Sequence, residues 1–399
     1  MSHSHTPEVE TLLLCVRPAR SAGDIATIRS LVSSLNWDLF YKIARRHSLL
    51  PLAYRRLNET AGQFIPAEEL QKLKLAYELN AARNLILTNE LVQMTQALAQ
   101  NGIQSIAYKG PALAVLAYGD PALRRFIDLD LMVRRENVLQ AAEVLASRGY
   151  HPVKSLTSDQ LALLLQTQHN LQLVSESRVI VELHWQVSSQ LFASSVTAEE
   201  LWNNLETIRL NGFPVKSFST EDLLFSLCVH GSRHLWERLA WIADVAHLLQ
   251  VRPEIDWSAL VARARAANAE RMFLLGLYLA SDLLHSQLPE IVTNQISQDK
   301  VMAQLANAIT ARLFDGPEHH PATTRQILVY NLRVRRGLRS RLQYLLFTLT
   351  PSDSDVSLFT VPPRWRVAYY LLRPFRIFAK RREAPPSPPT KLSKSRPAP

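Results

Sequence analysis

Residues 103–133, IQSIAYKGPALAVLAYGDPALRRFIDLDLMV, decide the fold of this chain. The segment begins with a short apolar run at 103–108, which predicts a strand. Lys109 and Gly110 follow, and the proline after them suits the first position of a helix. The segment ends at 127–133, where apolar and polar residues alternate. The pattern therefore predicts a strand, a tight turn, a helix and a second strand.

The strand expected at 127–133 has one apolar face and one open face. Asp128 and Asp130 lie on the open face, because side chains alternate along a strand. Two carboxylates on one face repel each other unless a cation lies between them, and Mg²⁺ commonly takes one or two carboxylates together with substrate phosphates. The alternative is a solvent-facing strand with ordinary acidic residues.

The turn at Lys109 and Gly110 precedes a helix. Free N–H groups at a helix start favour phosphate, Lys109 adds a positive charge, and Gly110 lets the backbone come close to a ligand. The alternative is a routine turn with a solvated lysine.

A third carboxylate occurs in VIVELHW, residues 179–185. Glu182 shares a strand face with His184, and burying an unpaired carboxylate is expensive. A cross-strand ion pair or an edge strand is the alternative. Together with Asp128 and Asp130, Glu182 supplies three carboxylates from two strands, and such a set can hold one or two divalent ions for a nucleotidyl displacement.

Helical patterns flank this region on both sides. We expect an α+β fold, in which a mostly helical chain surrounds a small mixed sheet. The expected divisions are a helical region at 1–100, the α/β core at 101–218, a helical domain at 219–350 and a basic aromatic tail at 351–399 with a disordered end.

The net charge of +10 is concentrated near the C-terminus. Residues 361–399 hold ten basic residues and one acidic residue, so the remaining chain carries only about +1. A body with so little net charge argues against a protein that wraps nucleic acid. The tail could dock on the body through its aromatic side chains, contact an anionic membrane surface, or contact nucleic acid.

Composition also bears on location. Cys15 and Cys228 are the two cysteines, too few for a disulfide framework, which indicates a reducing compartment. The N-terminus lacks the pattern of a signal peptide, and the longest apolar run, Met272–Ala280, is too short to span a membrane. We expect a cytoplasmic protein without a transmembrane segment, with membrane association through the tail as an option.

Two histidines and an aspartate lie further along the chain. His230 and His234 share a helix face, but the sequence offers no third ligand with the spacing of a zinc site. Asp244 lies among apolar residues, and we expect it to form a structural ion pair with Arg233 or Arg238.

The order of these motifs resembles a known family. The segments are IARRHSLLPLAYRRL at 43–57, AYKGPALAVLAYGDPALRRFIDLDLMV at 107–133, VIVELHW at 179–185 and LCVHGSRHLWERLAWIADVAHLL at 227–249. They resemble the uncharacterised nucleotidyltransferase family of the polymerase-beta-like superfamily, in which a Lys-Gly turn replaces the usual Gly-Ser. The resemblance covers roughly residues 35–290.

The resemblance implies roles for the acidic residues. Asp128 and Asp130 would bind the metal that carries a nucleoside triphosphate. Glu182 would bind a second metal or help to activate the acceptor hydroxyl. The implied ions are Mg²⁺, two of them, with Mn²⁺ as an alternative.

The resemblance also implies roles for basic residues. Lys109 and Gly110 would contact the phosphates, and Arg124 would contact phosphate too. His184 would orient Glu182 or contact the acceptor, and the family tends to have a histidine at the position of His169.

The implied reaction is Mg²⁺-dependent transfer of a nucleoside monophosphate from a nucleoside triphosphate to an acceptor, which is a small molecule, a sugar, a protein or RNA. One position departs from the family, because Ile127 stands where a small residue is usual and narrows the expected site. The alternative function is therefore a catalytically inactive nucleotide-binding sensor or scaffold.

Overall fold

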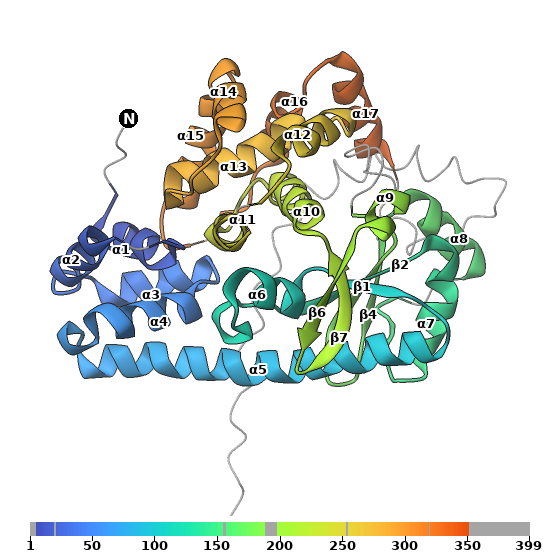
Figure 1. Ribbon diagram of the computed structural model, residues 1–399, viewed down its shortest axis with the longest axis horizontal. Coiled ribbons are helices and arrows are strands. Elements are labelled where there is room, and N and C mark those ends of the chain that lie inside the picture. The colour runs from blue at the N-terminus through green and yellow to red at the C-terminus, as the bar shows by residue number, and fades with distance from the viewer. Residues whose placement is uncertain are drawn as a thin grey trace, which may run out of the picture.

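The N-terminal helices rest on one long helix. The computed structural model describes residues 5–19, 21–154, 157–187, 198–252, 254–318 and 320–350. The first helices are α1 (Pro7–Val16), α2 (Ala22–Leu31), α3 (Trp37–Arg46), α4 (Leu50–Ala61) and the short η1 (Gly62–Phe64). They lie along one end of α5 (Ala67–Gln100), which spans about 50 Å at 1.5 Å per residue (Figure 1).

The helix α5 is longer than its apolar stripe suggests. Its second half buries Leu87, Leu91, Met94 and Leu98, as expected for one helical face. This half packs below the sheet, whereas the first half packs below α4 (Figure 1). The helix therefore connects the N-terminal helices to the sheet.

A five-stranded mixed sheet forms the centre of the molecule. Its spatial order is β1 (Ser105–Ala107), β2 (Asp128–Val133), β5 (Ile180–His184), β4 (Asn170–Val174) and β3 (His151–Pro152). The β2 and β5 strands run parallel, and the other neighbouring pairs are antiparallel. The expected α+β class, a mostly helical chain around a small mixed sheet, is confirmed.

Short helices lie between these strands or, in the case of α9 (Ala198–Asn203), follow the last of them. The others are α6 (Gly110–Tyr118), η2 (Pro121–Leu123), η3 (Arg135–Asn137), α7 (Val138–Ala146) and α8 (Ser158–Thr167). The helix α6 follows directly on the turn at Lys109, and η2 leads into β2. Residues 103–133 therefore form β1 and β2 at one edge of the sheet, together with the helix α6 between them.

A separate hairpin lies beside the sheet. Its strands β6 (Leu205–Leu210) and β7 (Phe213–Phe218) pair antiparallel through a two-residue turn. Asn211 and Gly212 both have positive φ, +48° and +85°, which is typical of an Asn-Gly hairpin turn. This hairpin was not predicted from the sequence, although the Asn-Gly dipeptide is a signal for it.

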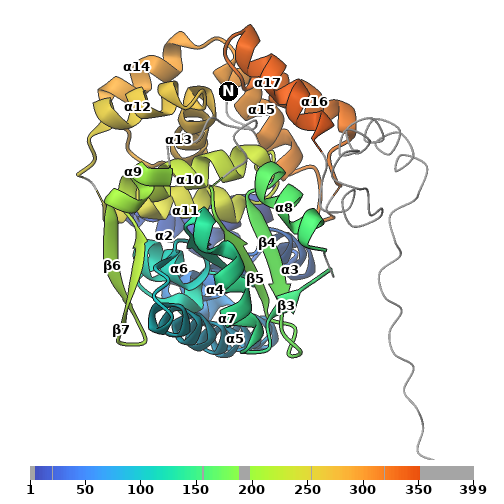
Figure 2. The same ribbon diagram turned by 90° about the vertical axis from the view of Figure 1, so that its right-hand side faces the viewer.

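The C-terminal helices cover the sheet from above. They are α10 (Thr220–Arg233), α11 (Leu239–Val251), α12 (Trp257–Ala266), α13 (Glu270–Leu284), α14 (Glu290–Gln298), α15 (Met302–Leu313), α16 (Thr324–Arg333) and α17 (Leu338–Leu349). Figures 1 and 2 show this layer above the hairpin and the sheet. The expected helical character of 219–350 agrees with these elements.

Two hydrophobic cores meet at β2. Leu129 and Leu131 belong to a core that the sheet shares with α5 and α7. Met132, on the opposite face, packs in the core of the N-terminal and C-terminal helices. The strand therefore turns Asp128 and Asp130 toward the helical side of the molecule.

Some predictions remain open after the fold is described. The division into four segments stays a prediction, and the tail at 351–399 lies outside the described residues. In the part of the chain described above, no helix combines the length and the apolar character needed to cross a membrane. Cys15 and Cys228 are buried and do not pair.

Candidate active site

Two parallel strands bring the predicted carboxylates together. In the register of β2 and β5, Asp130 lies opposite Glu182, and Asp128 lies opposite Ile180. Because side chains two residues apart share a face, all three carboxylates lie on the same side of the sheet. The pairing of the strands, which the sequence pattern did not specify, completes the cluster.

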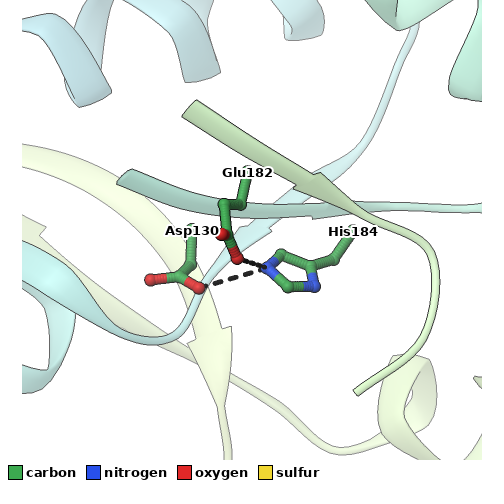
Figure 3. A group of neighbouring side chains, drawn as sticks. All are labelled: Asp130, Glu182 and His184. Carbon is green, nitrogen blue, oxygen red and sulfur yellow. Dashed lines mark hydrogen bonds and ion pairs between the residues drawn. The ribbon is translucent and has the colours of Figure 1, made fainter. Parts of the chain in front are cut away.

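His184 lies between two of these carboxylates. Its Nε2 is 3.1 Å from Oδ1 of Asp130 and 3.2 Å from Oε2 of Glu182 (Figure 3). Ionised carboxylates only accept hydrogen bonds, so Nε2 carries the proton and donates it. His184 thus contacts Glu182, with which it was expected to share a strand face, and it contacts Asp130 as well.

The residues most closely arranged for a metal are Asp130, Glu182 and His184. One ligand atom from each lies within 4.8 Å of the others, and no second such group occurs in the described part of the chain. The predicted ligand set had Asp128 in place of His184. The roles of Asp128, Asp130 and Glu182 as ligands stay a prediction.

The charges at this site are unevenly compensated. Burial opposes ionisation of Asp130, but Lys109 and His184 outweigh it and hold the pKa of Asp130 far below its usual range. Asp128 behaves in the opposite way, because burial and then the negative charges of Asp130 and Glu182 raise its pKa. The cluster therefore carries more negative charge than its own cations neutralise.

Hydrogen bonds to both carboxylates affect His184 and Glu182. Burial disfavours the imidazolium form of His184, but the bonds to Asp130 and Glu182 prevail and raise its pKa. Burial likewise disfavours the ionised form of Glu182, and the bond from His184 reverses this effect and lowers its pKa. The protonated, positively charged form of His184 is therefore favoured at this position.

The turn at Lys109 lies directly beside these acids. Lys109 Nζ donates to Asp130 Oδ1 at 3.1 Å. Gly110 opens α6 with φ +52°, and a Cβ there would lie 3.4 Å from the carbonyl oxygen of Asp128. A side chain at position 110 would be strained in this conformation, so glycine brings the turn close to β2. No side chain caps the start of α6.

His169 and Arg233 extend the site on the far side of His184. The rings of His169 and His184 have centroids 5.9 Å apart, and Arg233 Nη1 lies 2.5 Å from His169 Nε2. Burial, followed by the charge of Arg233, lowers the pKa of His169 well below its ordinary value. His169 is therefore a neutral ring whose Nε2 accepts from Arg233.

Two neighbours of the site, Tyr108 and Arg233, were not predicted from the sequence to lie there. Tyr108 packs edge-on against His184 with ring centroids 5.6 Å apart, and Arg233 contacts His169. Tyr108 ends the strand that was predicted before Lys109, so its position was a usable signal. Arg233 lies in a motif that was singled out, but no sequence spacing connects it with a histidine 64 residues away.

Arg124 has a different partner from the one expected. Its Nε donates to Asp244 Oδ1 at 2.8 Å, and its Nη2 donates to Asp244 Oδ2 at 2.9 Å. Tyr118 also donates to Asp244. The prediction that Asp244 pairs with Arg233 or Arg238 is therefore wrong in the partner. The phosphate contact of Arg124 stays a prediction, and its guanidinium is engaged by Asp244.

Ile127 and the histidine pair lie outside the acidic cluster. Ile127 is 41% exposed, just before β2 begins. His230 and His234 lie with ring centroids 4.7 Å apart beside Trp241. Neither histidine belongs to a metal-competent group within the described ranges.

Comparison with known proteins gives a family and a distant structural likeness. Residues 33–285 match the family described as uncharacterised nucleotidyltransferase. Among solved structures, the chain matches an antigenic nucleotidyltransferase-like protein from Paracoccidioides brasiliensis, with a TM-score of 0.32 and 18% identity, over 52% of this chain and 96% of that chain. No curated protein matches the sequence.

Proposed function

The chain belongs to the uncharacterised nucleotidyltransferase family, and we propose that it transfers a nucleoside monophosphate from a nucleoside triphosphate to an acceptor in a reaction that depends on divalent metal. The observation that carries this proposal is the register of β2 and β5. This register sets Asp130 opposite Glu182, and Lys109 donates a hydrogen bond to the Asp130 carboxylate.

The acidic cluster fits a divalent cation. Asp128, Asp130 and Glu182 are three carboxylates beside one lysine, and burial followed by the negative charges of Asp130 and Glu182 raises the pKa of Asp128. His184 already holds a proton between two of them. Mg²⁺ suits such oxygen ligands, and Mn²⁺ is an alternative. One or two ions bound here would neutralise triphosphate charge and align the reacting oxygens.

The turn before α6 suits the phosphates of the donor. No side chain caps the first turn of α6, so a backbone N–H group that is left without a partner there would favour an anion. Lys109 is the adjacent cation, and Gly110 keeps the backbone close to β2. The reaction would then be accelerated mainly by positioning and by fixed charges.

The acceptor side of the reaction involves Glu182. An acceptor hydroxyl oxygen forms a bond to the α-phosphorus, and its proton passes to the Glu182 carboxylate. The bond from the α-phosphorus to the oxygen that bridges to the β-phosphate breaks, and pyrophosphate leaves with the electron pair. His184, which donates to Glu182, positions this carboxylate.

Labelled nucleotides test the proposal directly. The protein is incubated with Mg²⁺, cell extract and ATP, CTP, GTP or UTP that carries label in the α-phosphate. We expect a labelled acceptor with the wild type and none with Asp130→Asn. Glu143→Gln, an exposed carboxylate-to-amide change on α7, is the matched control and should label the acceptor normally.

Three other outcomes would each contradict a part of the proposal. Equal labelling by wild type and Asp130→Asn would exclude the acidic cluster as the site. Persistent nucleotide binding by the wild type without labelling would identify the chain as an inactive nucleotide-binding protein. Equal Mg²⁺ binding by the wild type and an Asp128→Ala/Asp130→Ala variant would contradict the metal assignment.

A further inference from the structure

A pocket of about 270 Å³ lies between the N-terminal helices and the segment that enters β2. Its walls come from α3, the start of α4, α5 and the residues just before β2. Three of its lining residues are arginines: Arg45 from α3, Arg83 from α5 and Arg125 from the segment before β2. Much of its wall belongs to the segment 43–57, a motif to which the proposed function gives no role.

The three arginines have no acidic partner in the part of the chain that the structure describes. No carboxylate forms an ion pair with Arg45, Arg83 or Arg125 within the described residues. Neighbouring arginines differ, because Arg46 pairs with Asp315 and Arg55 pairs with Glu59. The pocket therefore gathers three arginines without a carboxylate partner, whereas two arginines of the adjacent helices are paired.

Mutual repulsion accompanies this convergence. Burial and then the charges of Arg83, Arg238 and Arg45 lower the pKa of Arg125. A bound anion would relieve this repulsion. Guanidinium groups bind phosphate oxygens through two parallel hydrogen bonds, which makes phosphate the best-matched anion.

The rest of the wall is largely apolar. Tyr41, Leu50 and Pro51 face the same pocket as the arginines. Its volume is slightly below the range of about 300–1,000 Å³ that is typical of sites enclosing a drug-sized ligand. The pocket therefore fits a phosphate attached to one compact uncharged group better than a complete nucleoside triphosphate.

The pocket adjoins the acidic cluster along the chain. Arg83 Nη2 lies 3.5 Å from the carbonyl oxygen of Ile127, which precedes Asp128. Arg125 is three residues before Asp128, a separation of at most about 10 Å between Cα atoms in an extended chain. Arg125 therefore lies within three residues of the acidic cluster, which is the closeness that the substrate of one reaction requires.

We propose that Arg45, Arg83 and Arg125 bind the phosphate group of the acceptor, which is a small phosphorylated molecule. This inference rests on the proposed function, because it assigns the substrate class of the same reaction. The donor phosphates belong to the turn at Lys109 and Gly110, so the two anionic substrates occupy separate cationic sites.

Calorimetry with ribose 5-phosphate and ribose tests the ligand class. The titration uses the full chain in buffer with EDTA, so that metal at the acidic cluster does not contribute. We expect the wild type to bind ribose 5-phosphate at millimolar concentrations and not ribose. Arg45→Gln/Arg125→Gln should weaken this binding by about tenfold or more, because it removes two charged hydrogen-bond donors.

A matched control separates the pocket from general surface charge. Arg252→Gln removes an exposed arginine that pairs with Glu206, and it should bind ribose 5-phosphate as the wild type does. Circular dichroism checks folding of both variants, whose altered side chains are exposed. No preference for ribose 5-phosphate over ribose, or equal binding by the double variant, would overturn the proposal.

Binding of ATP with Mg²⁺ separates acceptor from donor. We expect Arg45→Gln/Arg125→Gln to bind this nucleotide as the wild type does. Loss of nucleotide binding in the double variant would make the pocket the donor site and overturn the acceptor assignment. A wild type that binds ribose 5-phosphate through these arginines but transfers no nucleotide would contradict the proposed function and still support the ligand class of the pocket.

Discussion

Asp130 and Asp244 are both buried aspartates next to a cation, yet their surroundings differ. Asp244 is 1% exposed and receives two hydrogen bonds from Arg124 and one from Tyr118. Asp130 is 5% exposed and contacts Lys109 and His184, but two more carboxylates lie on its face of the sheet. The charge of Asp244 is balanced by the Arg124 guanidinium, whereas Asp130 lies in a cluster whose negative charges outnumber its positive charges.

The difference separates a structural ion pair from a candidate site. The pair of Arg124 and Asp244 links the segment before β2 to α11 and leaves no charge uncompensated. The acidic cluster carries excess negative charge, which a bound divalent ion would neutralise. Buried charge alone does not indicate function, whereas an excess of buried charge of one sign makes a cluster a candidate site.

Removal of Arg124 should have the largest effect on stability. Arg124→Met leaves the Asp244 carboxylate buried without its main partner, and breaking a buried pair costs about 3–5 kcal/mol. Urea unfolding should show this loss in the free energy of unfolding. Arg124→Met/Asp244→Leu should recover part of it. Wild-type stability of the single variant would contradict the structural role.

His247 should make the same region sensitive to pH. It stacks on Tyr118, with ring centroids 4.4 Å apart, and its Nε2 donates to the carbonyl oxygen of Val16. Burial lowers the pKa of His247 to about 4, against the opposing effects of Val16 and Asp244. The unfolded chain keeps an ordinary histidine pKa near 6.5, so it binds more protons than the folded chain between these values.

Stability should therefore fall as the pH decreases from about 7 toward 4. Near pH 5, the lowered pKa of His247 should reduce the free energy of unfolding by about 2 kcal/mol relative to neutral pH. Urea unfolding at several pH values should give a flatter profile for His247→Gln than for the wild type. Parallel profiles would show that His247 keeps an ordinary pKa in the folded chain.

Asp128→Asn should have a smaller effect of the opposite sign. In buffer with EDTA, loss of one of three repelling carboxylates should raise the melting temperature. The corresponding gain in the free energy of unfolding should be about 1 kcal/mol or less. Addition of Mg²⁺ should then stabilise the wild type more than the variant. A lower melting temperature of the variant in EDTA would mean that Asp128 is already compensated.

Deletion of 383–399 should have the smallest effect. The acidic cluster and the Arg124–Asp244 pair lie far from these residues in the sequence, so nucleotide transfer should stay at the wild-type level. The labelling assay measures it. Loss of transfer with a preserved circular dichroism spectrum would show that the basic tail contributes to the reaction.

Local sequence patterns were sufficient for the elements of the site. The alternation at 127–133 placed Asp128 and Asp130 on one strand face, because the period of a strand is two residues. The same argument put Glu182 and His184 on a shared face. The Lys109 turn followed from a short apolar run that ends at glycine and proline.

Contacts between distant segments were beyond such patterns. Asp130 meets Glu182 only because β2 and β5 pair in parallel at one register. Arg124 and Asp244 are 120 residues apart, and the sequence around Asp244 pointed to Arg233 or Arg238 as its partner instead. The arginine pocket likewise combines three separate segments, so no single motif reveals it.

Binding of Mn²⁺, followed by electron paramagnetic resonance, tests the central claim most directly. The account predicts that the wild type and Glu143→Gln bind the ion equally. Asp130→Asn and Glu182→Gln, which each remove one ligand, should bind it at least about tenfold more weakly. Equal Mn²⁺ affinity in all four proteins would contradict the claim that the acidic cluster on β2 and β5 is a metal site.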